Sequence, residues 1–237
     1  RRFAKAYNNR GIIRWNSGDR EGAITDYDRA VAASPAFFEA YYNRGIARAA
    51  MSDYRRSIDD YTKAVSISPR YAKAFNNRGI SHMAVGEYTE AVADYDRAIE
   101  IDPSDPVFRN NRGVAFVRMD RPESALSDFS RAIELDPSYA AARRNRGIAH
   151  HLAGRYGEAA ADYREVLRIN PGDREIRQSR ERALAGRELA PRTSMAEDAR
   201  TPDRGLRRDG ERTIKREPRR DRPATPGPGL RPEEKRA

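Results

Sequence analysis

The chain has 237 residues, of which 38% are hydrophobic and 35% charged, and its formal net charge is +10. It contains no run of 18 or more apolar residues, so the sequence does not predict a membrane-spanning helix. Cysteine is absent, which excludes a disulfide framework, a thiolate metal site and a cysteine nucleophile, and permits a reducing compartment without requiring one. We expect a cytoplasmic protein, or a periplasmic one if a signal peptide has been removed before Arg1.

One triplet, Asn-Arg-Gly, returns every 34 residues, at 9–11, 43–45, 77–79, 111–113 and 145–147. Small, aromatic and proline residues return with it, and in the second unit these are Gly45, Ser57, Tyr61, Ala64 and Pro69. This pattern resembles the 34-residue tetratricopeptide repeat. The resemblance covers residues 4–173 and divides them into five units, 4–37, 38–71, 72–105, 106–139 and 140–173.

Each unit predicts two amphipathic helices, because apolar residues recur at three- and four-residue intervals, as in 38–51 and 53–67. Pro69 ends the second helix. Gly45 and Ala64 lack bulk and let a neighbouring helix approach, and Tyr61 fills the space beside them. One helix pair cannot bury its apolar face alone, so the units must stack. We expect an all-α fold, a right-handed α-solenoid of stacked helix-turn-helix repeats.

The end of the chain departs from this pattern. Residues 174–186 lose the repeat signature but keep a helix-forming composition, so we expect a capping helix there. Residues 187–237 contain seven of the 14 prolines and 15 basic against 10 acidic residues, which predicts a disordered basic tail. Its arginines could contact nucleic acid or an anionic membrane. Interspersed acidic residues and the lack of aromatic side chains favour a solvated terminus instead.

The sequence predicts no catalytic, cofactor or metal site. His82 and His150 stand at the repeat offset that holds Arg14, Arg48 and Phe116 in the other units, which is typical of a packing position. His150 and His151 are adjacent and point in two directions around a helix, so they make a poor metal site. A glycine-rich phosphate loop of the required spacing is also missing from the sequence.

One arginine and one aspartate recur in every unit. A catalytic residue is needed once, so a carboxylate found five times is structural: these are Asp26, Asp60, Asp94, Asp128 and Asp162. The arginines lie where the repeat family usually has a large apolar residue, and they are Arg10, Arg44, Arg78, Arg112 and Arg146. Because desolvating an unpaired charge is costly, we expect each arginine to pair with an aspartate of a second helix, in its own or a neighbouring unit.

The resemblance places the five triplet asparagines on the inner, concave surface of the array: Asn9, Asn43, Asn77, Asn111 and Asn145. An amide side chain offers the donor and acceptor that a peptide backbone needs, so one per unit would hold an extended chain. Such a ladder resembles that of the repeat region of protein O-glycosyltransferases. An apolar row follows three residues later, at Ile12, Ile46, Ile80, Val114 and Ile148. Alternatively, the asparagines bond to a neighbouring helix and the apolar row only packs.

A second type of groove in this family binds the acidic C-termini of chaperones through a set of lysine, asparagine and arginine side chains. The matching positions here are Asn8, Ile12, Asn43, Lys73 and Asn77, and only Asn43 and Lys73 fit. This excludes a chaperone-tail clamp. Other expected groove positions lean basic and favour a mildly acidic ligand: Lys5, Glu39, Lys73, Arg118 and Arg144.

We therefore expect an interaction scaffold, without enzymatic activity or cofactor, that binds an extended peptide or a partner helix in its concave groove. One alternative is the substrate-recognition region of a larger enzyme whose catalytic domain precedes Arg1. Another is a peripheral adaptor whose basic tail contacts nucleic acid or a membrane. The ends of the array would also allow self-association.

Overall fold

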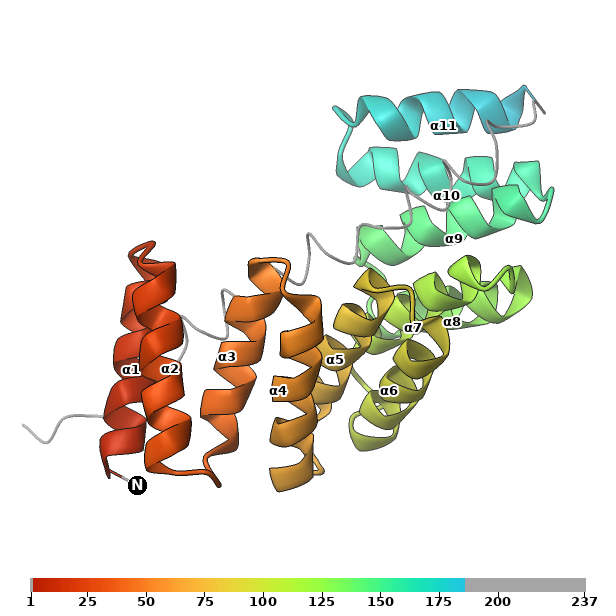
Figure 1. Cartoon of the computed structure of the whole chain (residues 1–237). Coiled ribbons are helices and arrows are strands. Elements are labelled where there is room, and N and C mark those ends of the chain that lie inside the picture. The colour runs from red at the N-terminus through yellow and green to blue at the C-terminus, as the bar shows by residue number, and fades with distance from the viewer. Residues whose placement is uncertain (1, 186–237) are drawn as a thin grey trace, which may run out of the picture.

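The computed structural model describes residues 2–185; Arg1 and residues 186–237, which hold the expected basic tail, lie outside the described residues. Within 2–185 all regular secondary structure is helical (Figure 1). The helices are α1 (Arg2–Asn16), α2 (Arg20–Ala33), α3 (Phe38–Ala50), α4 (Tyr54–Ile67), α5 (Ala72–Ala84), α6 (Tyr88–Ile101), α7 (Pro106–Arg118), α8 (Pro122–Leu135), α9 (Ala140–Leu152), α10 (Tyr156–Ile169) and α11 (Arg174–Leu184). Among these helices none has the length and apolar character needed to cross a bilayer.

The two helices of every unit are joined by a turn with one residue in the left-handed region. Gly18, Gly86 and Gly154 have φ of 89°, 83° and 73°, and Ser52 and Asp120 hold the same place with φ of 64° and 57°. Glycine adopts this conformation without a steric cost, whereas Ser and Asp adopt it at some expense. The turn geometry is therefore set by the repeat, and the residue at the turn varies within it.

Inside each unit, the triplet glycine faces an aromatic ring of the second helix. A Cβ atom added to Gly45 would lie 2.7 Å from Cε1 of Tyr61, and the other four units repeat this approach. The rings are buried: Tyr27, Tyr61, Tyr95, Phe129 and Tyr163. Close approach at Gly45 beside Tyr61 is thereby confirmed.

Successive units stack through the second helix of one and the first helix of the next, α2 with α3, α4 with α5, α6 with α7 and α8 with α9. Successive first helices also contact one another, and successive second helices approach less closely. The side formed by α1, α3, α5, α7 and α9 is therefore the inside of the curve, and we call it the inner face. Helix axes turn along the array, from upright in α1–α4 to nearly horizontal in α9–α11 (Figure 1).

Helix α11 occupies the place of a sixth first helix. It begins 34 residues after α9, and it buries Ile176 and Ala183, which stand 34 residues after the buried Ala142 and Ala149. Where the other units have the triplet glycine, α11 has Glu181. That side chain would block the aromatic ring of a following second helix. Helix α11 thus packs on α10 as a first helix does, and it is the last helix of the described residues.

Candidate functional site

The triplet arginines bind buried aspartates across each helix pair. In every unit the closest contact joins Nη2 of the arginine to Oδ1 of the aspartate 16 residues later, at 2.6–2.7 Å, and Nε also donates to the same carboxylate. Two parallel N–H donors on one carboxylate form a bidentate pair, the strongest common geometry for these groups. The pairing expected from the sequence is confirmed, and it lies within one unit.

A third contact of the same arginines crosses to the preceding unit. Nη1 of Arg44 lies 2.6 Å from Asp28, and Nη1 of Arg112 lies 2.6 Å from Asp96. In the other two interfaces the acceptor is a hydroxyl: Arg78 donates to Thr62 at 3.0 Å and Arg146 to Ser130 at 3.2 Å. These bonds fasten consecutive units to one another. The sequence carries a signal for these bonds, because Asp, Thr or Ser recurs at one repeat offset. We did not predict them from the sequence alone.

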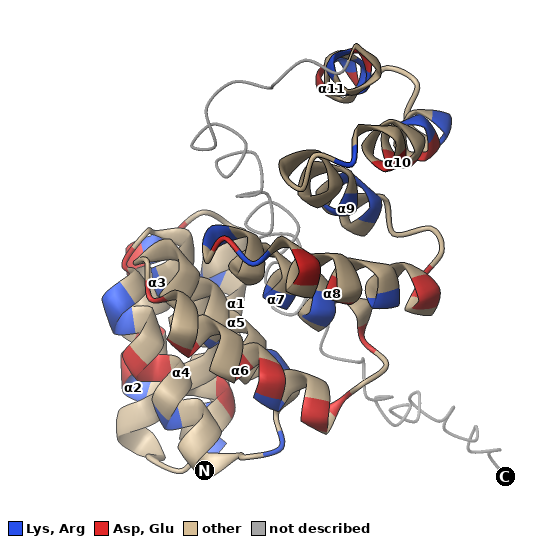
Figure 2. Cartoon of the chain, turned by 90° about the vertical axis from the view of Figure 1, so that its right-hand side faces the viewer, with Lys and Arg blue, Asp and Glu red and all other residues tan. Residues whose placement is uncertain are grey.

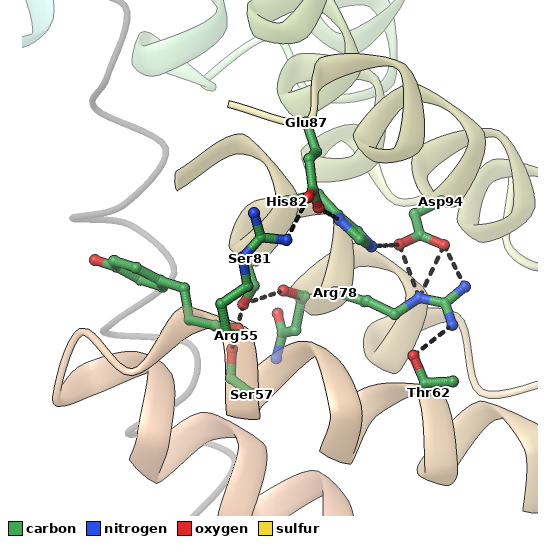
Figure 3. Close-up of polar contacts among 10 residues, drawn as sticks. Arg55, Ser57, Thr62, Arg78, Ser81, His82, Glu87 and Asp94 are labelled. Carbon is green, nitrogen blue, oxygen red and sulfur yellow. Dashed lines mark hydrogen bonds and ion pairs between the residues drawn. The ribbon is translucent and has the colours of Figure 1, made fainter. Parts of the chain in front are cut away.

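A further basic side chain joins the aspartate in most units. Arg14 and Arg48 lie 3.1 and 2.8 Å from Asp26 and Asp60. In the third unit Nε2 of His82 lies 3.8 Å from Asp94, and Nδ1 lies 2.7 Å from Glu87 (Figure 3).

His82 therefore links two carboxylates inside its own unit. Its hydrogen bond, together with one from Arg55 of the preceding unit, holds the pKa of Glu87 below its usual range. The structural role expected for this repeat position fits these contacts of His82 with Glu87 and Asp94.

In the fourth unit an aromatic and a basic residue around the ion pair have exchanged positions. In the first three units an aromatic ring three residues before the arginine stacks on its guanidinium: Tyr7 on Arg10, Tyr41 on Arg44 and Phe75 on Arg78, at 5.4–5.5 Å. The fourth unit has Arg109 at that place, and Phe116 stacks on Arg112 at 5.8 Å instead. Nη1 of Arg109 lies 3.9 Å from Asp128. The aromatic and the basic side chain have changed places around one ion pair.

The triplet asparagines form a chain of amide hydrogen bonds along the inner face. The last four donate from Nδ2 to the residue 35 positions earlier: Asn43 to Asn8 at 3.0 Å, Asn77 to Tyr42 at 3.1 Å, Asn111 to Asn76 at 2.9 Å, and Asn145 to Asn110 at 2.9 Å. Asn76 and Asn110 donate in turn to Asn77 and Asn111, at 3.2 and 3.4 Å. A continuous relay therefore runs from Asn145 through three interfaces to Tyr42.

Burial separates the predicted binding asparagines into two groups. Asn43, Asn111 and Asn145 are buried, with Asn111 only 1% exposed, so their amides face neighbouring helices. Asn77 is half-buried and Asn9 is exposed. The apolar row divides in the same way, because Ile46, Val114 and Ile148 are buried while Ile12 and Ile80 are half-buried. A direct role of these side chains in binding a ligand stays a prediction.

One interior helix keeps an accessible inner stripe from end to end. On α5, Lys73 and Ala84 are exposed, and Asn77 and Ile80 are half-buried. Their spacing of four, three and four residues places them on one face of the helix. We call these four residues the α5 stripe. In α3, α7 and α9 the equivalent central pair, asparagine and aliphatic residue, is buried.

A difference in the neighbouring helix accompanies this accessibility. The acceptor for Asn77 is the Tyr42 hydroxyl, whereas the other three interfaces use an asparagine at this repeat position. The Tyr42 ring packs edge-on against Tyr71, with centroids 4.8 Å apart, and is tilted against Tyr61. The longer side chain reaches Asn77 from a fixed aromatic cluster, and the amide remains partly open to solvent.

The remaining chemistry of residues 2–185 is sparse. In this range no group of three His, Asp or Glu side chains is placed to hold a metal ion. His151 is buried and stacks edge-on against Tyr156, with centroids 4.8 Å apart, and burial lowers its pKa. Positively and negatively charged residues are interspersed along the helices, as the blue and red segments of Figure 2 show.

Comparison with known protein families agrees with this architecture. Models of the tetratricopeptide repeat match residues 16–52, 38–71, 72–105 and 110–174. The chain belongs to the tetratricopeptide repeat family. Such repeats generally act as modules for protein–protein interaction and are typically non-catalytic scaffolds. No curated protein sequence matches the chain.

Several solved structures share the fold of this tetratricopeptide array. MamA from Desulfovibrio magneticus RS-1 is 20% identical, with a TM-score of 0.67, over 73% of this chain and 97% of that chain. YrrB, described as a tetratricopeptide protein with an unusual peptide-binding site, is 23% identical, with a TM-score of 0.63, over 77% and 91%. TTC0263 from Thermus thermophilus is 19% identical, with a TM-score of 0.60, over 77% and 99%.

Proposed function

We propose that this tetratricopeptide array is an adaptor that binds an extended peptide across its inner face, centred on the α5 stripe. The observation that supports this most directly is the accessibility of Lys73, Asn77, Ile80 and Ala84 along one face of α5. The equivalent stripes of the other interior first helices are closed at their centres. The description of YrrB as a peptide-binding protein of the same fold supports the same class of ligand.

The chemistry of the stripe suggests the kind of peptide. Lys73 is an exposed cation at one end and favours a carboxylate. Asn77 uses one amide N–H for Tyr42, and its Oδ1 accepts from Asn76, which leaves a second N–H and one lone pair of Oδ1 for a peptide backbone. Ile80 and Ala84 offer apolar surface at the other end. An extended peptide with an acidic residue a short distance from an apolar residue matches this order.

The buried asparagines take a different part in this proposal. Asn43, Asn111 and Asn145 hold successive first helices at a fixed separation through the relay. They act on a ligand through the shape of the inner face, and Asn77 acts through direct contact. Of the asparagine ladder expected from the sequence, the proposal thus keeps only Asn77, the accessible member in the middle of the array, as a direct contact.

The test uses the full chain and peptides selected against it from a random library displayed on phage. Affinities of the selected peptides are then measured by calorimetry for the wild type and for Lys73→Glu, with Lys63→Glu as a matched control. Lys63 is also exposed but lies on α4. A charge-assisted hydrogen bond contributes about 1.5–3 kcal/mol, so we expect Lys73→Glu to weaken binding by about 10- to 100-fold, and Lys63→Glu to leave it unchanged. Failure to select any peptide, or equal losses in the two variants, would contradict the proposal.

A further inference from the structure

The fifth unit departs from the asparagine relay at one position of its first helix. In the first four units, the residue before the triplet asparagine is buried and accepts the amide of the next unit: Asn8, Tyr42, Asn76 and Asn110. The fifth unit has Arg144 at this place, and its side chain is 19% exposed. Because a guanidinium has no acceptor, the relay does not continue from α9 to α11. The inner face carries a cation there instead.

Helix α11 places a carboxylate on this cation. Its counterpart of the triplet asparagine is Ser179, which stands 34 residues after Asn145 and donates to the backbone oxygen of Glu175 at 3.0 Å. Oε1 of Glu175 lies 3.0 Å from Nη2 of Arg144. A carboxylate of the chain itself therefore sits at Arg144, in the geometry that an acidic residue of a ligand would use.

The contact between Arg144 and Glu175 can be exchanged without moving a helix. The Glu175 side chain is 58% exposed and lies in the first turn of α11. In the ion pair of Arg146 in the same unit, by contrast, the Asp162 side chain is only 7% exposed. A pair with one exposed partner contributes little, because solvent screens it and a long side chain loses its freedom. Another carboxylate can thus take the position of Glu175 by a rotation of that side chain.

Arg144 lies within reach of a peptide bound at the α5 stripe. Helix α7 lies between α5 and α9 and contacts both. At about 8–10 Å between the axes of packed helices, Lys73 and Arg144 are separated by about 16–20 Å across the inner face. An extended peptide covers that distance with about five or six residues. Between the two cations α7 presents the half-buried Val107, which like Lys73 is the second residue of its helix.

We propose that Arg144 is a second carboxylate-binding site of the inner face and that Glu175 is its internal competitor. This inference rests on the proposed function, because the occupant is a second acidic residue of the same extended peptide, about five or six residues from the one at Lys73. An apolar residue between them contacts Val107. Peptides with two acidic residues at this spacing displace Glu175, and peptides with one leave it in place. Helix α11 thereby adds to the selectivity of the array.

The test uses the full chain and the peptides selected on phage, with affinities measured by calorimetry. Glu175→Gln removes the competing charge and keeps the shape of the side chain. We expect it to strengthen the binding of peptides with two acidic residues about two- to fivefold, the range expected for the loss of an exposed ion pair. Glu181→Gln is the matched control and should leave binding unchanged. Glu181 is also exposed on α11, but it stands six residues from Glu175 and so on a different face of the helix.

A substitution at Arg144 identifies the site itself. Arg144→Gln should weaken the binding of these peptides about tenfold, and in the double variant the gain from Glu175→Gln should disappear. Replacing the second acidic residue of the peptide by glutamine should have the same two effects.

Two kinds of result would overturn this inference, and they differ in what they say of the proposed function. If the selected peptides carry only one acidic residue, or respond to Lys73→Glu but not to Arg144→Gln and Glu175→Gln, the α5 stripe is the binding site and Arg144 is not part of it. If Lys73→Glu has no effect either, or if no peptide is selected, the proposed function fails and the second site fails with it.

Discussion

Alanine substitution at the triplet asparagines tests whether their main role is structural. Asn111 is 1% exposed, donates to Asn76 at 2.9 Å and accepts from Asn110 at 3.4 Å. Asn111→Ala removes both bonds and leaves two buried amides without this partner. A buried polar group that loses its partner costs about 1–3 kcal/mol, so we expect the free energy of unfolding to fall by about 2–4 kcal/mol.

Asn9 provides the matched control, because it is the same residue at the same repeat position but is exposed and has no preceding unit among the described residues. Asn9→Ala should change the free energy of unfolding by less than about 0.5 kcal/mol. Asn77→Ala should fall between the two, since Asn77 is half-buried and bonds to the Tyr42 hydroxyl. The three variants therefore form a series graded by burial and by the hydrogen bonds that each asparagine makes to the preceding unit.

The assay is urea unfolding followed by circular dichroism at the helix band, with the midpoint and slope compared among the variants. The reasoning fails if Asn9→Ala is as destabilising as Asn111→Ala, or if Asn111→Ala leaves the midpoint unchanged. In that case the relay contributes nothing to stability, and the buried asparagines would have to be explained by ligand binding.

Three other substitutions test the packing, the ion pairs and the pH response. Gly113→Ala places a Cβ atom 2.6 Å from the ring of Phe129. The overpacking costs about 1–3 kcal/mol and should outweigh the helix-propensity gain of about 1 kcal/mol, so the melting temperature should fall. A Cβ atom added at Gly157 has no neighbouring atom within 4 Å, so Gly157→Ala should raise the melting temperature. Arg78→Asp breaks a buried pair and should cost about 3–5 kcal/mol in chemical denaturation, an expectation that an unchanged midpoint would refute. Burial lowers the pKa of His151, so the unfolded chain takes up the proton first and stability falls as the pH drops below about 6.5. Melting curves of His151→Phe should therefore depend less on pH between about 7.5 and 5.5, and an undiminished dependence would assign the effect to other groups.

Periodicity made most of the fold predictable from the sequence. Gly45, Tyr61 and Ala64 recur at fixed offsets because every unit solves the same packing problem, so the helix pairs and their close approach could be inferred from one unit. The arginine–aspartate pairing was predictable for the same reason, since Arg44 and Asp60 keep a constant separation. Contacts that recur within every unit can therefore be predicted from the sequence of one unit.

The environment of the asparagines was harder to predict because it depends on the relation between units. Asn43 is buried and donates to Asn8, whereas Asn77 is half-buried and donates to Tyr42, 35 positions earlier in each case. Adjacent asparagines at 76–77 and 110–111 were the available signal for a relay. Comparing equivalent positions of the repeats one at a time does not reveal it, because the two asparagines occupy different repeat positions. The exchange of Arg109 and Phe116 was hidden in the same way, since each column alone shows only variation.

The acceptors of the crossing arginine bonds alternate along the array, from Asp28 to Thr62 to Asp96 to Ser130. A carboxylate holds a guanidinium more tightly than a hydroxyl does. At this one contact, units one and two, and units three and four, are thus held more tightly than units two and three. Units two and three, and units four and five, have a hydroxyl acceptor at this offset instead, Thr62 and Ser130. If the proposed peptide reaches from α3 to the α5 stripe, it bridges an interface whose crossing arginine bond ends on the Thr62 hydroxyl and not on a carboxylate.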